Sequence, residues 1–324
     1  MNDQYGRRIH YLRVSVTDRC GLRCRYCMPE EGVEWLEHSR ILSYEQIVRL
    51  VRAAAGLGID TVRLTGGEPL VRKGLDKLVW AVKAIDGIRT VTLTTNGVLL
   101  AQQLPALRAA GLDGVNLSLD TLDREQYAAI TRRDLLSRAL EGLEAALAAP
   151  GLKVKLNCVP MGDNDDQLVP LAALARDRAL DVRFIELMPI GLGSTLPRRT
   201  QAEVLEQLEG AFGPALPCDQ GGGSGPGRYV TFAGFTGRVG FISAVSHQFC
   251  ESCNRVRLTA TGFLKTCLQY ETGVNLKALL ESGADGAAIR AAMEGAIFAK
   301  PACHHFSAAG TAEDERRSMY QIGG

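Results

Sequence analysis

The chain has 324 residues, 46% hydrophobic and 23% charged, a balance that allows a globular protein with a large core. Its 37 basic and 36 acidic residues give a net charge of +1, which excludes a general electrostatic attraction to nucleic acid or to an anionic membrane surface. The first fifteen residues are rich in charge and lack a continuous apolar run, so no secretory signal is predicted, and no later stretch is long enough to span a membrane.

Short β-branched runs alternate with helical patterns through the first part of the chain. Helices are predicted from residues 43, 134 and 165, and Ser43 and Gln46 form the N-terminal signature of the first. This alternation is typical of a parallel sheet covered by helices. It predicts the α/β class and a partial (β/α)6 barrel, with an open doubly wound sheet as the alternative. The predicted strands cover 12–17, 61–65, 90–95, 114–119, 152–159 and 181–187.

The character of the chain changes after about residue 190. Residues 220–228 are rich in glycine and predict a flexible loop, and 228–232 with 237–246 predict a short antiparallel pair. We therefore expect two regions, a barrel over 1–190 and a C-terminal extension over 191–324 that packs on it.

Nine cysteines are present, and six of them occur in two tight sets instead of being spread along the chain as a disulfide framework would be. This usage predicts metal ligation in a reducing cytoplasm. Cys20, Cys24 and Cys27 have the spacing C-x3-C-x2-C directly after the first predicted strand. A [4Fe–4S] cluster has four irons, so three cysteines leave one iron for a small molecule. A zinc site is the alternative, but it needs a fourth ligand, and the nearest candidate is His38.

With Tyr26 just before its last cysteine, this loop resembles the signature of the radical S-adenosylmethionine (SAM) superfamily. The resemblance implies that the open iron binds the amino and carboxylate groups of SAM, which is cleaved to a 5′-deoxyadenosyl radical. The run Gly66–Pro69 resembles the GGEP element of that superfamily, and further matches follow the later strands at the same edge of the sheet. The implied SAM contacts are Tyr26, Gly67, Ser118 and Met188.

Cys250, Cys253 and Cys267 form a second set with the spacing C-x2-C-x13-C. The spacing alone leaves two interpretations open: a second cluster with one open iron, or a zinc site completed by His247.

The two cysteine sets, the arginines after the second and the terminal Gly-Gly together resemble the family of molybdenum cofactor biosynthesis protein A, the GTP 3′,8-cyclases, from Arg13 to Gly324. The resemblance implies two [4Fe–4S] clusters and SAM, with the second cluster holding the GTP base. It also implies that the deoxyadenosyl radical removes the ribose 3′ hydrogen of GTP and that C3′ then attacks C8. The product would be (8S)-3′,8-cyclo-7,8-dihydroguanosine 5′-triphosphate, in the first step of molybdenum cofactor biosynthesis.

The same resemblance implies the substrate contacts, and a triphosphate does need several guanidinium or ammonium donors. The tail, with Gly323 and Gly324, is implied to reach the active-site region. An electron carrier, a zinc-stabilised binding module and a radical SAM enzyme with another substrate are the alternatives. The implied GTP contacts are Arg13, Arg63, Thr94, Lys155, Arg255, Val256 and Arg257.

The resemblance further implies an external electron donor and cyclic pyranopterin synthase as the next enzyme, and the chain is expected to be a monomer or a homodimer. Gly21 stands where the family usually has asparagine. Arg198 and Arg199 are expected to be solvated, and a metal role for His304 and His305 is not favoured. Ordinary thiols are expected at Cys158, Cys218 and Cys303.

Overall fold

The computed structural model describes residues 1–219, 225–306 and 314–323, and in it the six predicted strands form the parallel centre of one sheet. These strands, β1 to β6, lie side by side in chain order, and every neighbouring pair is parallel, so this prediction is confirmed. Their bounds are Tyr11–Ser15, Thr61–Thr65, Thr90–Thr95, Gly114–Ser118, Lys153–Cys158 and Asp181–Ile185.

Alternation along the strands separates the core from the inner side of the sheet. In β1, Leu12 and Val14 belong to the hydrophobic core, whereas Arg13 lines a cavity. In β2, Val62 and Leu64 are core residues on either side of Arg63, which also lines the cavity. Because successive side chains of a strand point to opposite faces, the arginines reach the inner side while the aliphatic residues pack under the helices.

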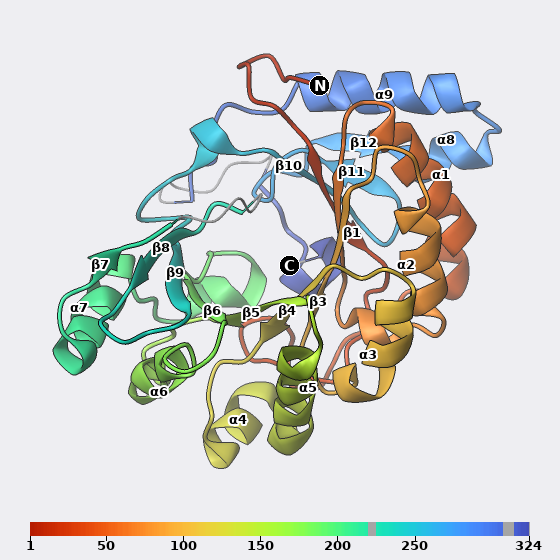
Figure 1. Cartoon of the computed structure of the whole chain (residues 1–324). Helices are drawn as coiled ribbons and strands as arrows, with labels where there is room; N and C mark the ends of the chain where they lie inside the picture. Colours follow the sequence, from red (N-terminus) through yellow and green to blue (C-terminus); the bar gives the residue numbers. More distant parts are fainter. Residues whose placement is uncertain (220–224, 307–313, 324) are drawn as a thin grey trace.

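Helices cover the outer side of the curved sheet (Figure 1), which confirms the partial barrel and not the doubly wound alternative. The first predicted helix is α1, Tyr44–Ala55, and it begins with the predicted capping box, in which Ser43 accepts from the Gln46 amide. The second predicted helix is α5, Leu136–Ala148. The other helices of this part are α2, α3 and α4, over Leu75–Lys83, Leu100–Ala109 and Arg124–Thr131.

The third predicted helix, from residue 165 to 179, is wrong in length. A 3-10 turn over Asp165–Gln167 leads into α6, Leu168–Ala173, which then ends. Beyond it the Ala175 and Arg176 carbonyls accept hydrogen bonds from Gly237 and Thr236, on the loop between two later strands. Tertiary hydrogen bonds therefore replace the helical ones that local propensity favoured.

The C-terminal part of the chain extends the sheet at both edges. The predicted antiparallel pair is confirmed as β8, Arg228–Thr231, with β9, Arg238–Ile242, and β9 also pairs in parallel with β6. At the opposite edge β10, Arg255–Leu258, pairs in parallel with β1, a neighbour that was not predicted. The twelve strands have the order β12-β11-β10-β1-β2-β3-β4-β5-β6-β9-β8-β7.

The remaining elements complete this extension. Its other strands are β7, β11 and β12, over Leu216–Pro217, Phe263–Lys265 and Gly273–Asn275. Its helices are α7, α8, α9 and α10, over Gln201–Phe212, Leu276–Glu281, Gly286–Phe298 and Met319–Ile322. The larger hydrophobic core includes residues from before and after residue 190, and the division there stays a prediction. Among the described residues, no helix has the length and apolar character needed to cross a bilayer.

Candidate active site

A cavity of about 460 Å3 lies on the inner side of the curved sheet, and both cysteine sets line it. Residues from all six central strands and from the C-terminal extension contribute to its wall. The predicted SAM contacts line this cavity, and so do all the predicted GTP contacts except Val256. The tertiary structure therefore gathers nearly every predicted site residue around one space.

The first cysteine set lies on the loop that follows β1. The Cys27 and Met28 amides both donate to the Cys24 carbonyl, at 2.8 and 2.9 Å, which folds the loop into a tight turn. Burial raises the pKa of Cys20 to about 11 and that of Cys27 to about 12, and neighbouring acidic groups add to the effect. Burial is also the main cause that raises the pKa of Cys24, and the neighbouring Cys27 is the next largest. These thiols resist ionisation until a cation binds them.

Gly66 and Gly67 pack against this loop without space for a side chain. A Cβ at Gly67 would lie 2.5 Å from the Arg19 carbonyl oxygen, and one at Gly66 would lie 2.5 Å from that of Thr17. The Gly67 amide donates to the Thr17 carbonyl at 2.9 Å. Because they lack a side chain, the two glycines bring their backbone close to the loop of the first cysteine set. This contact fixes the position of that loop.

Two buried carboxylates hold the loops around the first cysteine set. Glu68 accepts from the Thr95 hydroxyl at 2.8 Å and from the Asn96 amide at 2.7 Å, and burial raises its pKa to about 7. Asp120 accepts from the Tyr26 hydroxyl at 2.8 Å, and burial raises the pKa of Asp120 to about 6. Neither carboxylate was among the predicted site residues.

The second cysteine set also lines the cavity, and in the chain it lies between β9 and β12. Burial raises the pKa of Cys250. Burial also opposes ionisation of Cys253, but the nearby cations Lys300 and Arg255 outweigh it and lower the pKa of that thiol. His247, the ligand that a zinc site would need, is exposed and does not line the cavity. The geometry therefore favours a group held inside the cavity by the three cysteines.

The donor chemistry of both sets fits an iron–sulfur cluster. The six cysteines of the two sets lie in the described residues, and they are free thiols. Within the described part of the chain, no three His, Cys, Asp or Glu side chains converge as ligands of one metal ion. A cluster does not require such convergence, because each cysteine binds a different iron. Each set can thus hold one cluster and leave one iron facing the cavity.

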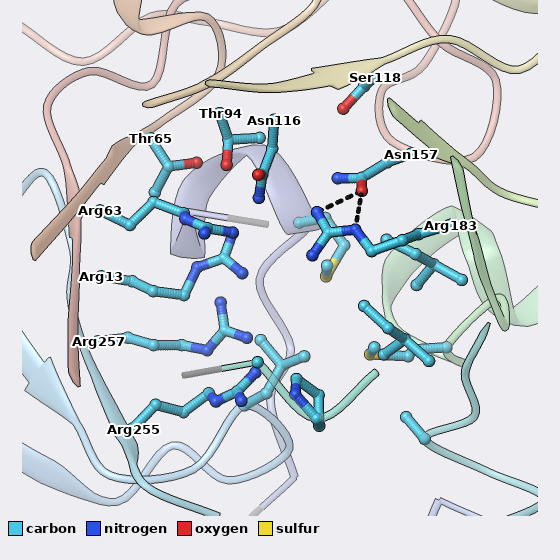
Figure 2. A pocket seen from close by; sticks show the side chains of 18 of the residues that line it. Arg13, Arg63, Thr65, Thr94, Asn116, Ser118, Asn157, Arg183, Arg255 and Arg257 are labelled. Carbon is cyan, nitrogen blue, oxygen red and sulfur yellow. Dashed lines mark hydrogen bonds between the residues drawn. The ribbon is translucent and has the colours of Figure 1, made fainter. Parts of the chain in front are cut away.

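Six arginines line the same cavity, and five of them, all but Arg7, stand on strands of the sheet. Arg13 of β1 lies in register with Arg63 of β2 on one side and with Arg257 of β10 on the other, so the three form one row across the sheet. Figure 2 shows this row with Arg255 next to it, and Arg183 reaching toward it from the opposite wall. The row exists only because β10 pairs with β1 and brings the C-terminal arginines to the first strand.

Arg183 of β6 is a site residue that sequence reasoning missed. Its Nε and Nη2 both donate to the Asn157 side-chain oxygen, at 2.9 and 2.6 Å. When the side-chain amide of Asn116 is turned so that its oxygen faces the arginines, that oxygen accepts from Arg63 and Arg183. Arg183 lies in a buried strand, and a charged residue in such a strand is the signal from which a site residue could have been predicted.

Burial of these cations is costly in the absence of an anion. Burial and the neighbouring Arg257 lower the pKa of Arg13, and burial with Arg255 lowers the pKa of Arg257 to about 10. Lys155 differs, because it forms an ion pair with Asp181 at 2.7 Å and contacts the Tyr229 hydroxyl at 3.0 Å. A polyanion bound between the arginines would relieve their mutual repulsion.

The C-terminal tail lies inside the curved sheet, next to both the arginine row and the first cysteine set (Figure 1). Arg257 Nη1 donates to the Gly323 carbonyl at 3.0 Å, and the Tyr320 backbone hydrogen-bonds the Cys27 thiol. Gly323 has a φ of +74° and packs on Ser15 and Thr65. Gly324, also predicted for the site, lies outside the described residues.

Val256, another predicted substrate contact, does not line the cavity with its side chain, and its assignment stays a prediction. It lies between Arg255 and Arg257 on β10, so alternation turns its side chain into the hydrophobic core, where it is 1% exposed. Arg198 is exposed, and Arg199 pairs with Asp165.

The unassigned cysteines and histidines of the predictions have separate environments. Cys158 is buried, whereas Cys303 is exposed at the edge of the cavity. His305 contacts the Tyr270 hydroxyl at 2.7 Å, and the His304 amide donates to Cys250 Sγ at 3.5 Å.

These observations define an α/β enzyme of the partial-barrel class, with two three-cysteine sets and a cationic wall around one cavity. Comparisons agree. The Radical SAM superfamily matches residues 14–175, and the Molybdenum Cofactor Synthesis C family matches residues 180–306. Among solved structures, Streptococcus suis SuiB is similar with a TM-score of 0.60 at 16% identity, covering 87% of this chain and 67% of that one.

Curated relatives match the full length of the chain. The GTP 3′,8-cyclase of Pelotomaculum thermopropionicum is 49% identical and that of Heliobacterium modesticaldum is 48% identical, each over 100% of both chains. The GTP 3′,8-cyclase of Geobacter sulfurreducens is 45% identical over 99% of both chains. The chain therefore belongs to the radical SAM superfamily and, within it, to the family of the GTP 3′,8-cyclases.

Proposed function

We propose that this chain is a GTP 3′,8-cyclase that converts GTP to (8S)-3′,8-cyclo-7,8-dihydroguanosine 5′-triphosphate, the first step of molybdenum cofactor biosynthesis. The observation that carries this proposal is the row of arginines that lines one cavity together with two three-cysteine sets. Such a row suits a triphosphate, and the full-length relatives carry the name of this activity.

In this proposal the first cysteine set holds a [4Fe–4S] cluster with SAM on its open iron. When bound and reduced, the cluster and SAM together supply the 5′-deoxyadenosyl radical that removes the ribose 3′ hydrogen. The chain's own residues hold SAM in place: Gly67, Ser118 and Met188 border the cavity, and Tyr26 is fixed by its bond to Asp120. This fixed wall limits the positions that the radical can reach.

The substrate lies between the arginine row and the second cysteine set. Arg13, Arg63 and Arg257 bind the phosphates in the proposal, with Arg183 on the opposite wall. Thr94 and Lys155 line the same cavity and complete the proposed substrate contacts. Arg255 lies next to the second set, whose cluster would hold the guanine base. The wall of the cavity would hold ribose and base in one orientation, so that a radical at C3′ would lie close to C8.

The remaining assignments extend the proposal beyond the cavity. An external electron donor reduces the first cluster, and cyclic pyranopterin synthase receives the product. The chain acts as a monomer or a homodimer in the cytoplasm, where the thiols of the two cysteine sets stay reduced.

The direct test is anaerobic incubation of reconstituted protein with GTP, SAM and dithionite. We expect 5′-deoxyadenosine and a cyclised GTP product, both detected by mass spectrometry and both dependent on GTP. Deoxyadenosine without GTP conversion would retain the superfamily and reject the substrate. Neither product from protein with about eight irons would reject the function altogether.

Replacing Arg13 with methionine should weaken GTP binding without destabilising the unliganded protein. Loss of one charge-assisted hydrogen bond costs about 1.5–3 kcal/mol, which corresponds to roughly 10- to 150-fold in affinity. The unliganded chain loses one member of a repelling row, so its unfolding free energy should be unchanged or higher. Equilibrium GTP binding and urea unfolding measure the two effects.

The matched control is Arg52→Met, because Arg52 is an exposed residue of the last turn of α1. It should leave GTP affinity unchanged. Equal GTP affinity of Arg13→Met and the parent protein would contradict a phosphate-binding role for the row.

A further inference from the structure

The second cysteine set is contacted by one C-terminal segment, residues 300–304, which we call the strap. The strap contacts two cysteines of the set and the residue before the third. The His304 amide donates to Cys250 Sγ at 3.5 Å, the Lys300 side chain hydrogen-bonds Cys253, and Lys300 Nζ donates to the Thr266 carbonyl, next to Cys267. Lys300 itself is 3% exposed. The strap is thus part of the frame that places the three sulfurs.

One N-terminal arginine holds the strap. Arg7 Nη1 donates to the Ala302 carbonyl at 2.7 Å and to the Cys250 carbonyl at 2.9 Å. A single nitrogen therefore joins the strap to the loop that carries Cys250, which is the cysteine loop of the second set. Arg7 Nη2 donates to the Pro301 carbonyl at 2.6 Å. The planar guanidinium suits this task, because its donors diverge in one plane and reach several carbonyls at once.

Asp3 fixes Arg7 in turn. Asp3 Oδ2 accepts from Arg7 Nε at 2.6 Å, and Asp3 Oδ1 accepts from the Arg7 amide at 3.0 Å. Gly6 closes the tight turn between them with a φ of +77°. The side chains of Asp3 and Arg7 are 0% and 6% exposed, so the pair is dry. Breaking such a pair leaves a buried charge without compensation, which is strongly unfavourable.

We infer that Asp3 and Arg7 are positioning residues of the second cysteine set. They act on the cluster of that set indirectly, by holding the strap in place. The inference rests on the proposed cluster at Cys250, Cys253 and Cys267. The chain order is the physical reason: the cysteine loop and the strap are separated in sequence by β10 to α9, and the N-terminal turn joins them. Without Arg7, loop and strap lose their common donor.

The test measures iron at the second set alone. In a parent variant with Cys20→Ala, Cys24→Ala and Cys27→Ala, all iron bound after anaerobic reconstitution belongs to the second set, and we expect about four irons per chain. Adding Arg7→Met should reduce this to less than about one iron per chain and remove the cluster signal from Mössbauer spectra. Arg7→Lys, which keeps the charge but not the fork, should give an intermediate content.

Arg8→Met is the matched control, because Arg8 is the next residue and its side chain is 71% exposed. It should retain the full iron content of the parent. Arg7→Met is also made in the chain with all its cysteines, where circular dichroism and the iron at the first set check that the barrel still folds. SAM cleavage by this variant should stay within about twofold of that of the unaltered chain, since only the second set is affected.

Unchanged second-set iron in Arg7→Met would overturn the inference. Loss of iron from both sets, with loss of the native circular dichroism, would also overturn it, because Arg7 would then act on the whole fold. If the parent variant itself bound no iron, the proposed second cluster would fail together with the inference, whereas iron in the parent and in Arg7→Met would reject the inference alone.

Discussion

Replacing Cys253 with alanine should abolish formation of the cyclised product while SAM cleavage continues. The two cysteine sets line one cavity from separate segments of the chain, and no residue belongs to both. Loss of one ligand at the second set removes the group that holds the guanine base, so C3′ and C8 lose their alignment. We expect product to fall below detection, at least about 1,000-fold, because the effective molarity of an aligned pair is lost.

Cys24→Ala should behave differently from Cys253→Ala, because it removes a ligand from the set that holds SAM. Deoxyadenosine and product should then both disappear. Cys218→Ala is the control, since this thiol does not line the cavity. Deoxyadenosine and product are followed by mass spectrometry in the same reaction. Normal product from Cys253→Ala would refute a role for the second set in holding the substrate.

Replacing Glu315 with glutamine should release the C-terminal tail from the site. Glu315 forms an ion pair with Lys265, two residues before Cys267, and both side chains are fully buried. Arg317 Nε also pairs with Glu315, at 2.8 Å. Removing one partner of a buried pair costs about 3–5 kcal/mol, because the other charge stays in a dry environment. We therefore expect residues 314–323 to open locally, because opening exposes the remaining charge to water.

Hydrogen exchange of the tail amides measures this release directly. We expect the tail of Glu315→Gln to exchange at least about 100-fold faster, as a cost of about 3 kcal/mol requires. Cyclisation should fall as well, because Gly323 then no longer accepts from Arg257. Unchanged tail exchange in Glu315→Gln would refute the anchor.

Two further variants separate the buried pair from a general effect of charge. Glu281→Gln breaks an exposed pair with Lys277, in which the glutamate is 60% exposed, and should cost less than about 1 kcal/mol. Combining Glu315→Gln with Lys265→Met removes both buried charges and should recover part of the lost protection. No recovery in the double variant would show that the contact matters for its shape and not for its charge.

The cysteine loops and the strand order could be predicted from the sequence because both are written in local spacing. Three cysteines within eight residues reach one cluster wherever the loop lies, and strand–helix alternation leads to parallel neighbours. Ser43 and Gln46 fixed the start of α1 for the same reason, since a capping box involves four consecutive residues. Prediction failed where distant contacts compete, as just after α6, where the Ala175 and Arg176 carbonyls accept from the loop before β9.

By itself the sequence determined the two cysteine sets, the six central strands and the family that they indicate. Only the tertiary structure decided that β10 pairs with β1, which aligns Arg257 with Arg13, and that Val256 turns into the core. It also decided that Arg7 joins the cysteine loop to residues 300–302. Contacts between residues so far apart depend on the register and packing of the whole sheet, and no short-range spacing encodes them.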